Sequence, residues 1–250
     1  MLDGKVIIIT GAGSGIGRDA AHMMAAAGAR LILADMNADA GKAVEADIAA
    51  RGGQARFLAT DIAREADCKA LADAALADHG RLDGAFNNAA IAQLSIPLHD
   101  LPADVWQRNI DVTLTGTFFC MKYQIRAMLA NGGGAIVNTS SAAGVAAFPL
   151  APEYCSAKHG VVGLTRNAAL DYGGKGIRVN AILPGAVRTP MLMKAMGENA
   201  GMEAYLKTIH PLGRYAEPNE VAAAAMWLLS DQASFITGAA IPVDGGYTAH

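Results

Sequence analysis

The chain has 250 residues, a formal net charge of −3 and 17% charged residues. This length admits one large α/β domain or two small ones with a substantial core. The charge balance excludes the basic surface that nucleic-acid-binding and membrane-surface proteins carry, and charged or turn residues interrupt every apolar run well short of the ~20 residues that a membrane-spanning helix needs. We therefore expect neither a nucleic acid nor a membrane as partner.

Short apolar runs alternate along the chain with Ala- and Leu-rich segments at helical spacing. The apolar runs are near-continuous, which is typical of strands buried on both faces of a sheet. The expected strands span residues 5–10, 30–35, 55–60, 82–88, 134–140 and 177–183, and expected helices between the first of them span 16–27, 39–51 and 65–79. This order predicts a parallel sheet with helices on both faces.

A seventh apolar run spans residues 239–246, where Pro242 indicates a strand at the edge of the sheet because proline lacks a backbone N–H. No Pro/Ser-rich linker, block of charge or internal repeat divides the chain. We therefore expect a single doubly wound α/β domain over residues 1–250.

The first expected strand leads into the sequence TGAGSGIG, with glycines at 11, 13, 15 and 17 before a helix. Glycine lets the backbone turn sharply and lets a pyrophosphate approach the helix N-terminus, where free N–H groups favour an anion. The spacing Gly11-x3-Gly15-x-Gly17 differs from the usual GxGxxG fingerprint, so the glycines alone are a weak indicator. Their place between a strand and a helix predicts a dinucleotide site.

The second expected strand ends at Asp35, near the ~20-residue offset at which a dinucleotide-binding fold holds the adenosine ribose with an acid. A carboxylate there accepts hydrogen bonds from the ribose hydroxyls and repels a 2′-phosphate. Neither Met36 nor Asn37 supplies a cation for that phosphate, and Ser14 is neutral. NAD is therefore favoured over NADP, the alternative being that Asp35 is a solvated turn residue.

Cysteine and histidine usage gives no sign of a metal site. Cys68, Cys120 and Cys155 form no CxxC pair, and their odd number argues against a disulfide framework. The histidines lack HExxH spacing, and only His210, beside Pro211, is a candidate substrate contact. Because the N-terminus also lacks the pattern of a signal peptide, we expect a cytoplasmic protein without metal.

Tyr154 and Lys158 lie four residues apart in APEYCSAKHG, so on a helix they share one face. Taken alone, this pair favours an exposed amphipathic turn. The pair gains meaning from the motifs that surround it.

Five motifs occur in a fixed order along the chain: TGAGSGIG at 10–17, NNAA at 87–90, NTSSAAG at 138–144, YCSAK at 154–158 and PGAVRTP at 184–190. With them the chain resembles the short-chain dehydrogenase/reductase family over essentially its whole length. The resemblance implies a single-domain Rossmann fold with a seven-stranded sheet, a bound NAD and a homotetramer.

The resemblance also implies the catalytic roles. Tyr154 is the expected acid/base, Lys158 lowers its pKa and holds the nicotinamide ribose, and Ser141 orients the substrate oxygen. The chemistry agrees with this assignment, because a free phenol with a pKa near ~10 needs a nearby cation to act as a base at neutral pH.

One position departs from the family pattern. In DVTLTGTFF (111–119), Thr113 stands where the family has a fourth catalytic residue, an asparagine whose backbone carbonyl supports a relay water. Threonine keeps that carbonyl, and its hydroxyl can bond the carbonyl of Asn109. We expect the relay to be retained at Thr113.

The cofactor contacts implied by the resemblance extend over six segments. They are Gly11, Ser14, Gly15, Ile16 and Gly17 at the phosphates, Asp35 and Met36 at the adenosine ribose, Asp61 and Ile62 at adenine, Asn88 and Ala89 along the ribose, Tyr154 and Lys158 at the nicotinamide ribose, and Val187 and Thr189 at the carboxamide. Three have alternatives: Asp61 as a helix cap, Asn88 as a turn residue and Thr189 as the residue before Pro190.

Residues 186–213 resemble the family's substrate lid. The stretch 191–211 holds four of the eleven methionines, which adapt to irregular apolar shapes, and two glycines that permit movement. The alternative is a helix pair at an oligomer interface. The opposite wall is expected from Ala142, Ala143, Val145 and Ile91, so a compact apolar secondary alcohol or ketone fits best, and several phrases resemble dehydrogenases of cyclic alcohols and cyclohexadiene diols.

The sequence therefore indicates an NAD-dependent enzyme that interconverts a small apolar secondary alcohol or diol and the ketone by hydride transfer. A 3-oxoacyl carrier-protein reductase is an alternative that Asp35 disfavours, and an enoyl reductase of this fold would space tyrosine and lysine more widely. A non-catalytic dinucleotide-binding sensor is indicated only by Thr113.

Overall fold

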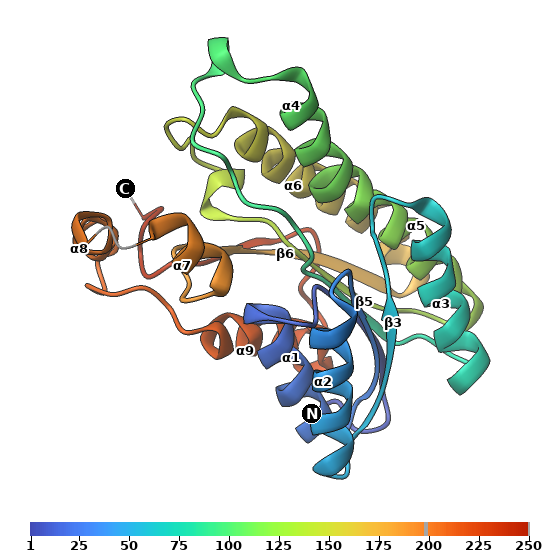
Figure 1. The fold of residues 1–250 in the computed structure, drawn as a ribbon. Helices are drawn as coiled ribbons and strands as arrows, with labels where there is room; N and C mark the ends of the chain where they lie inside the picture. The colour runs from blue at the N-terminus through green and yellow to red at the C-terminus, as the bar shows by residue number, and fades with distance from the viewer. Residues whose placement is uncertain (198–199, 250) are drawn as a thin grey trace.

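The computed structural model describes residues 1–197 and 200–249. Within these ranges one seven-stranded parallel sheet has the order β3-β2-β1-β4-β5-β6-β7 (Figure 1). The strands are β1 Val6–Thr10, β2 Arg30–Asp35, β3 Gln54–Ala59, β4 Gly84–Asn87, β5 Gly134–Thr139, β6 Ile177–Pro184 and β7 Ala240–Val243. The single α/β domain and the edge position of β7 are confirmed, and the expected strand boundaries differ from these by at most three residues.

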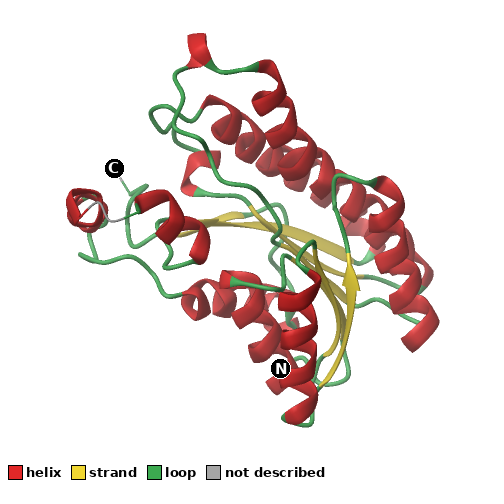
Figure 2. Ribbon diagram, viewed as in Figure 1, coloured by secondary structure: helices red, strands yellow, loops and turns green. Residues whose placement is uncertain are grey.

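Helices cover both faces of the sheet, as Figure 2 shows. One face carries α1 (Gly15–Ala26), α2 (Ala38–Ala50) and α9 (Pro218–Leu229), and the other carries α3 (Glu65–His79), α4 (Ala103–Asn109), α5 (Gly116–Ala130) and α6 (Pro152–Tyr172). Two further helices, α7 (Pro190–Met196) and α8 (Ala200–Thr208), lie beyond the end of β6. None of the described helices is both long and apolar enough to span a bilayer.

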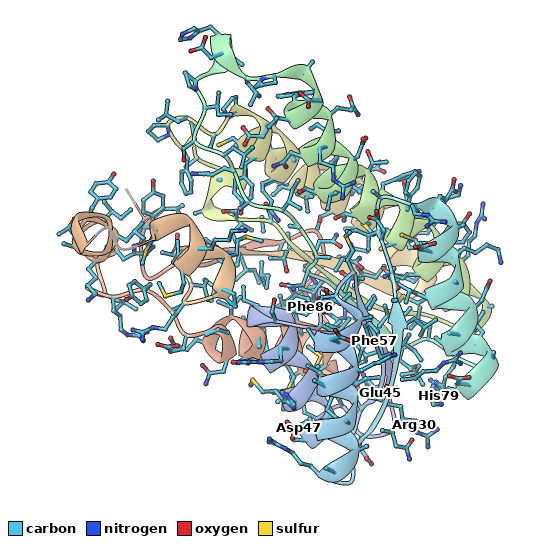
Figure 3. The ribbon with its side chains drawn as sticks, in the orientation of Figure 1. Arg30, Glu45, Asp47, Phe57, His79 and Phe86 are labelled. Atoms are coloured by element: carbon cyan, nitrogen blue, oxygen red, sulfur yellow. The ribbon has the colours of Figure 1, made fainter. Side chains whose placement is uncertain are left out.

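The continuous apolar character of the strands follows from the two cores. Ile7 and Ile9 of β1 pack into the core beneath α1 and α9, whereas Val6 and Ile8 pack into the core beneath α3, α5 and α6. Because successive side chains of a strand point to opposite faces, both sets must be apolar. Phe86 in β4 lies at the centre of the sheet and is fully buried (Figure 3).

The outer strand β3 is fastened by α2. Glu45 accepts a hydrogen bond from the backbone N–H of Phe57 at 2.8 Å. A Cβ on Gly41 would lie 2.0 Å from the Phe57 ring, so the helix approaches the strand closely because residue 41 is glycine. Both labelled side chains, Glu45 and Phe57, lie on this flank of the molecule in Figure 3.

The topology places the functional segments at one edge. The chain moves outward from β1 to β3 and then returns to the centre at β4, so β1 and β4 are neighbours with connections that leave in opposite directions. In doubly wound folds the crevice at this switch point, outside the carboxyl ends of the strands, receives the ligand. The loops that follow β1, β2, β4, β5 and β6 all leave the sheet at that carboxyl edge.

Between α4 and α5 the helix widens into a π-helical turn, Ile110–Thr115. Such turns occur frequently at functional sites because they redirect backbone carbonyls. The turn packs against α6, since a Cβ on Gly160 would lie 2.7 Å from the Leu114 side chain. Thr113 lies within it, where the sequence alone predicted an ordinary helix.

Candidate active site

The glycine turn after β1 has a backbone that only glycine supplies. Gly11 and Gly15 have φ of +67° and +50°. A Cβ on Gly17 would lie 2.0 Å from the carbonyl oxygen of Gly11, which is far inside van der Waals contact. The N-cap residue of α1, Ser14, makes no side-chain cap, and the first turn holds no acidic residue. This helix N-terminus therefore fits an anionic pyrophosphate.

Asp35 is bonded to the glycine turn and is more than a solvated residue. Its Oδ2 accepts from the N–H of Gly13 at 2.9 Å, and its Oδ1 accepts from the N–H of Asn37 at 2.9 Å. Asn37 in turn caps α2, its Oδ1 accepting from Ala40 N–H at 3.1 Å. Met36 is exposed beside the carboxylate. The carboxylate is thus held in a fixed position next to the phosphate-binding turn.

Asn88 and Ala89 follow β4 and are tied to the end of β1. The Thr10 hydroxyl accepts from the backbone N–H groups of Asn88 and Ala89 at 3.0 and 3.1 Å. The Asn88 amide donates to the carbonyls of Thr10 and Gly11 at 3.3 and 3.4 Å. Asn88 therefore holds the glycine turn as well as its own loop.

Asp61 and Ile62 follow β3. Asp61 Oδ1 accepts from Ala63 N–H at 3.0 Å in the turn before α3, whose N-cap residue is Arg64, so Asp61 does not cap that helix. Ile62 is buried in a small cluster with Cys68 and Cys120. A Cβ on Gly116 would lie 2.9 Å from Ile62, which shows how closely α5 approaches this loop.

Val187 and Thr189 follow β6. Val187 is buried and bridges to Ala216. The Thr189 hydroxyl caps α7 by accepting from Leu192 N–H at 3.3 Å, and its methyl group lies 3.0 Å from where a Cβ of Gly15 would stand. The structure thus brings the segment after β6 against the glycine turn after β1.

Ser141, Tyr154 and Lys158 lie where β5 ends and α6 begins. Ser141 Oγ accepts from Ala143 N–H at 3.1 Å. Lys158 Nζ donates to the Thr139 carbonyl at 2.8 Å and lies 5.6 Å from the centroid of the Tyr154 ring. A further bond from Ser140 Oγ to the Lys158 carbonyl (2.9 Å) fixes the helix on the strand.

Burial controls the titration of these groups. It raises the pKa of Tyr154, against a hydrogen bond from Ser141 that lowers it. Burial also lowers the pKa of Lys158 to about 7. Burial is the largest cause of the raised pKa of Tyr154, so the lowering of this pKa that we expect from Lys158 stays a prediction for the protein with bound cofactor.

Thr113 is buried, but the bond expected for its hydroxyl is not formed. Thr113 Oγ1 and Asn109 Oδ1 are both buried without a hydrogen-bond partner. The Thr113 carbonyl accepts instead from the hydroxyl of Thr117 at 2.8 Å. The hydroxyl of Thr117 thus occupies part of the acceptor capacity of this carbonyl, and the relay water expected there stays a prediction.

A buried polar network connects β4 and β5 with α5 and α6 and was not anticipated from sequence. Asn87 donates to Gln124 and Asn138, both at 2.9 Å, and accepts from Gln124 at 2.7 Å. Asn138 donates to Thr165 at 2.9 Å. A satisfied network of this kind fixes strands and helices in one arrangement. Its only sequence signal is polar residues inside otherwise apolar strands.

His210, the candidate substrate contact, lies at the end of the segment that was predicted to be a lid, and its ring nitrogens bond the chain. The ring is buried. Nε2 accepts from Ala186 N–H at 3.1 Å, and Nδ1 donates to the Leu206 carbonyl at 2.6 Å. With both ring nitrogens engaged, His210 anchors the segment. Residues 198 and 199, inside the predicted lid, lie outside the described residues.

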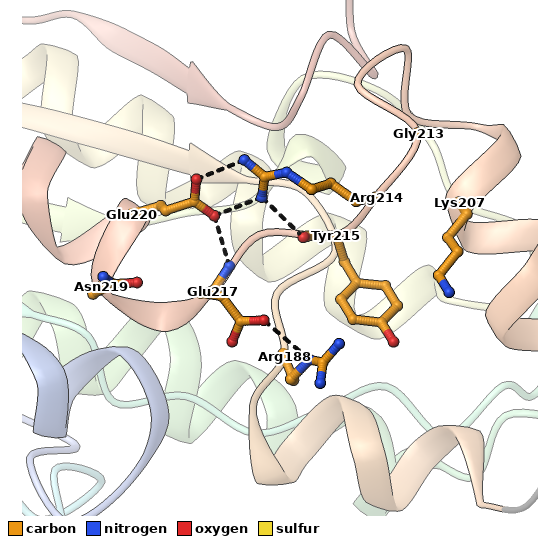
Figure 4. Close-up of a pocket in the computed structure, with 8 residues that line it drawn as sticks. All are labelled: Arg188, Lys207, Gly213, Arg214, Tyr215, Glu217, Asn219 and Glu220. Carbon is orange, nitrogen blue, oxygen red and sulfur yellow. Dashed lines mark hydrogen bonds and ion pairs between the residues drawn. The ribbon is translucent and has the colours of Figure 1, made fainter.

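A cavity of about 660 Å³ lies between this segment and α9, away from the catalytic residues (Figure 4). Arg214 bonds Glu220 through two contacts of 2.7 Å, and Arg188 pairs with Glu217 at 3.1 Å. The Arg214 guanidinium, with the backbone N–H of Glu217, holds the pKa of Glu220 down to about 2. Within the described chain no cluster of three His, Cys, Asp or Glu residues has the arrangement of a metal site.

Known proteins resemble the chain over its whole length. A family profile described as enoyl-(acyl carrier protein) reductase matches residues 11–248. The chain is 57% identical over 249 residues to 2,5-dichloro-2,5-cyclohexadiene-1,4-diol dehydrogenase of Sphingobium indicum, covering 99% of this chain and 98% of that protein. It is 43% identical over 245 residues to cyclohexanol dehydrogenase of an Acinetobacter species, covering 98% and 95%.

A solved structure agrees with these relatives. A short-chain type dehydrogenase/reductase from Mycobacterium marinum has a TM-score of 0.92 and 34% identity to this chain, covering 100% of this chain and 97% of that one. The shared sequence and the shared fold therefore extend over the same residues.

Proposed function

Because this chain is a dehydrogenase of the short-chain dehydrogenase/reductase family, we propose that it uses NAD to oxidise a small, largely apolar cyclic secondary alcohol or diol to the ketone. The observation that carries this proposal is the meeting of Ser141, Tyr154 and Lys158 beside a glycine turn to which Asp35 is bonded. The four-residue offset from Tyr154 to Lys158 supports alcohol oxidation over enoyl reduction.

Each catalytic residue has one task in this reaction. Ser141 Oγ holds the substrate oxygen in place. Tyr154 accepts the hydroxyl proton at its phenolate oxygen, and Lys158 holds the nicotinamide ribose and passes the proton onward through a water at the Thr113 carbonyl. Bound NAD supplies the hydride acceptor and a positive charge that favours the phenolate. Ketone reduction uses the same residues in reverse.

Asp35 is the residue that selects NAD. A carboxylate fixed by the N–H groups of Gly13 and Asn37 has lone pairs left for the adenosine ribose hydroxyls. The same charge repels the 2′-phosphate of NADP, and neutral Asn37 and exposed Met36 offer it no cation.

The remaining cofactor contacts follow the edge of the sheet. Gly11, Ser14, Gly15, Ile16 and Gly17 would hold the pyrophosphate; Asp61, Ile62, Asn88 and Ala89 would line the adenosine; Val187 and Thr189 would bond the carboxamide. The contact of Thr189 with Gly15 supports this arrangement, because it places the residue proposed for the carboxamide beside the turn proposed for the pyrophosphate.

Residues 186–213 form the substrate lid in this proposal, with the buried His210 as its fixed end. The wall opposite the lid is small and apolar, with Ala142 and Ala143 buried beside Ser141. Such a wall suits a compact carbocycle. Two similar proteins, the dichlorocyclohexadienediol dehydrogenase and the cyclohexanol dehydrogenase, support the same substrate class.

We also propose a cytoplasmic homotetramer. Phe118, Leu170, Trp227 and Phe235 are exposed on α5, α6, α9 and the segment before β7. Apolar side chains of this size on two sides of a molecule suit interfaces with further copies. The free thiols of Cys68 and Cys120 suit a reducing compartment. Sedimentation velocity tests the tetramer.

The variant Tyr154→Phe tests the reaction class. We expect turnover of cyclohexanol to fall by about 10³-fold or more, since the acid/base is lost, while NAD affinity measured by calorimetry changes by less than about threefold. Ser141→Ala is the companion variant and should lose turnover with the same intact NAD affinity. Unchanged turnover in Tyr154→Phe would contradict the proposal and favour a binding protein without catalysis.

A further inference from the structure

The segment after β7 forms a tight turn that is fastened to the end of the lid segment. The Asp244 carboxylate accepts from the N–H of Gly246 at 3.0 Å and from the N–H and hydroxyl of Thr248 at 2.9 and 2.6 Å. The Gly245 carbonyl accepts from Leu212 N–H at 3.1 Å. In Figure 1 this C-terminal part of the chain lies beside α7. The turn therefore holds Tyr247 in a defined position.

The Tyr247 ring lies between two other rings from distant parts of the chain. It meets Phe148 edge to face, with centroids 5.5 Å apart and planes at 88°. It meets His210 at 5.5 Å and 35°. Aromatic pairs prefer such tilted and edge-to-face arrangements. The cluster joins the C-terminal turn, the lid's fixed end and the stretch that connects β5 to α6.

The Phe148–Tyr247 pair is close to the reacting groups. Phe148 lies on the chain between Ser141 and Tyr154, and its N–H donates at 3.3 Å to the sulfur of Cys155, the residue next to Tyr154. Burial, together with Tyr205 of α8 and Cys155 nearby, raises the pKa of the Tyr247 hydroxyl. The ring of Tyr247 is thus held between Phe148, on the stretch that leads into α6, and His210, which follows α8.

The two rings are only partly buried, unlike the structural Phe86. Apolar side chains near them in sequence or on the lid are exposed by about half: Val145 45%, Leu150 50%, Met191 44% and Tyr205 57%. A protein rarely leaves such a group of apolar side chains uncovered unless a ligand or a partner covers it. Val145 and Leu150 lie on the same stretch of chain as Phe148, between Ser141 and Tyr154, so we infer that the ligand that covers them is the substrate.

We propose that Tyr247, supported by Phe148, is the wall against which the carbon ring of the substrate packs, and that Tyr247 determines the preference for six-membered cyclic alcohols over open-chain ones. This inference rests on the proposed function and names a residue that sets its substrate class. A rigid carbocycle presents a fixed apolar face to the phenol, whereas a flexible chain loses rotamer freedom on binding the same surface.

The experiment compares kcat/KM for cyclohexanol and 2-hexanol, with saturating NAD, in wild type, Tyr247→Phe and Tyr247→Leu. Tyr247→Leu should lower kcat/KM for cyclohexanol by about tenfold, mainly through KM, and that for 2-hexanol by less than about threefold. Tyr247→Phe keeps the ring and should change both by less than about threefold. Tyr172→Leu, near the end of α6 beside Lys175, is the matched control.

Two results in Tyr247→Leu overturn the inference: an equal loss of kcat/KM with both alcohols, which indicates a structural role, or no loss with either alcohol. A binding measurement separates this failure from failure of the proposed function. In the Tyr154→Phe background, cyclohexanone binding to the NADH complex, followed by NADH fluorescence, should weaken by about tenfold when Tyr247→Leu is added. Unchanged binding overturns the role of Tyr247 even if the wild type oxidises neither alcohol.

Discussion

The two ends of the reaction site are built in different ways. On the cofactor side, backbone groups define the surface: Gly11 and Gly15 have positive φ, and both Asp35 oxygens accept from backbone N–H groups. On the substrate side, side chains from distant segments define it, as in the contact of Phe148 with Tyr247 across 99 positions of the chain. Backbone conformation and hydrogen bonds fix the proposed cofactor side. The proposed substrate side has apolar side chains that are exposed to solvent.

This difference indicates how the two sides tolerate change. A binding surface made from backbone groups is lost when its glycines are substituted, because other residues do not allow the same backbone conformation or close approach. A surface made from side chains can be altered one residue at a time, and such a change alters which substrate binds without abolishing the binding site. Substitutions on the cofactor side should therefore have the larger effects.

The largest effect is expected for Gly17→Val. Its Cβ would lie 2.0 Å from the Gly11 carbonyl oxygen, so the turn must move away from the phosphate position. We expect NAD affinity, measured by calorimetry, to fall by about 100-fold or more. The control is Gly174→Val, where an added Cβ meets nothing within 4 Å and affinity should not change. Equal affinity in Gly17→Val and wild type would contradict the close approach at this turn.

A smaller effect is expected for Asp35→Asn, which keeps the shape of the side chain and removes its charge. The ratio of kcat/KM with NADP to that with NAD should rise by about tenfold or more, because the repulsion of the 2′-phosphate is lost. Asp39→Asn, in the first turn of α2, is the control and should leave the ratio unchanged. If both variants shift the ratio equally, general surface charge and not Asp35 sets the preference.

Lys158→Met tests the charge of the catalytic lysine through stability. The pKa of Lys158 falls from 10.5 to about 7 on folding. Between these values the unfolded chain binds a proton that the folded chain lacks, so this group makes stability rise with pH from 7 to 10.5 and adds no slope below 7. The variant should lose that rise, a difference of order a few kcal/mol between the two ends of the window.

Urea unfolding at pH 7, 8 and 9 measures this difference in the protein without added cofactor. The wild type should gain more stability over this range than Lys158→Met does. Parallel pH profiles of the two proteins would mean that Lys158 titrates normally in the folded chain.

The smallest effect is expected at Thr113. Thr113→Asn restores the family residue and keeps the backbone carbonyl, so kcat for cyclohexanol should change by less than about threefold. Thr113→Val replaces the unpaired hydroxyl with a methyl group. It should also change kcat by less than about threefold, because that oxygen has no protein partner to lose. A loss of about 100-fold in Thr113→Val would show that the hydroxyl itself carries the proton relay.

The sequence was sufficient for the features that local chemistry determines. Apolar runs predicted the strands because both faces of the sheet are covered, and Pro242 predicted the edge strand because it cannot donate to a further neighbour. The glycine turn and Asp35 lie at the ends of β1 and β2, where the pattern placed them.

Other features depend on contacts that no local pattern encodes. The π-helical turn around Thr113, the bonded state of His210 and the packing of Tyr247 each depend on segments far away in the chain. The pKa of Lys158 also could not be read from its spacing to Tyr154, because it follows from burial.

The most direct test of the central claim follows NADH formation by absorbance with cyclohexanol, cyclohexanediols and open-chain secondary alcohols, with NADP measured in parallel. The account predicts turnover with NAD and a cyclic alcohol or diol, and kcat/KM for NAD at least about tenfold above that for NADP. No NADH formation with any of these alcohols while NAD still binds, or a higher kcat/KM with NADP than with NAD, would contradict the proposed function.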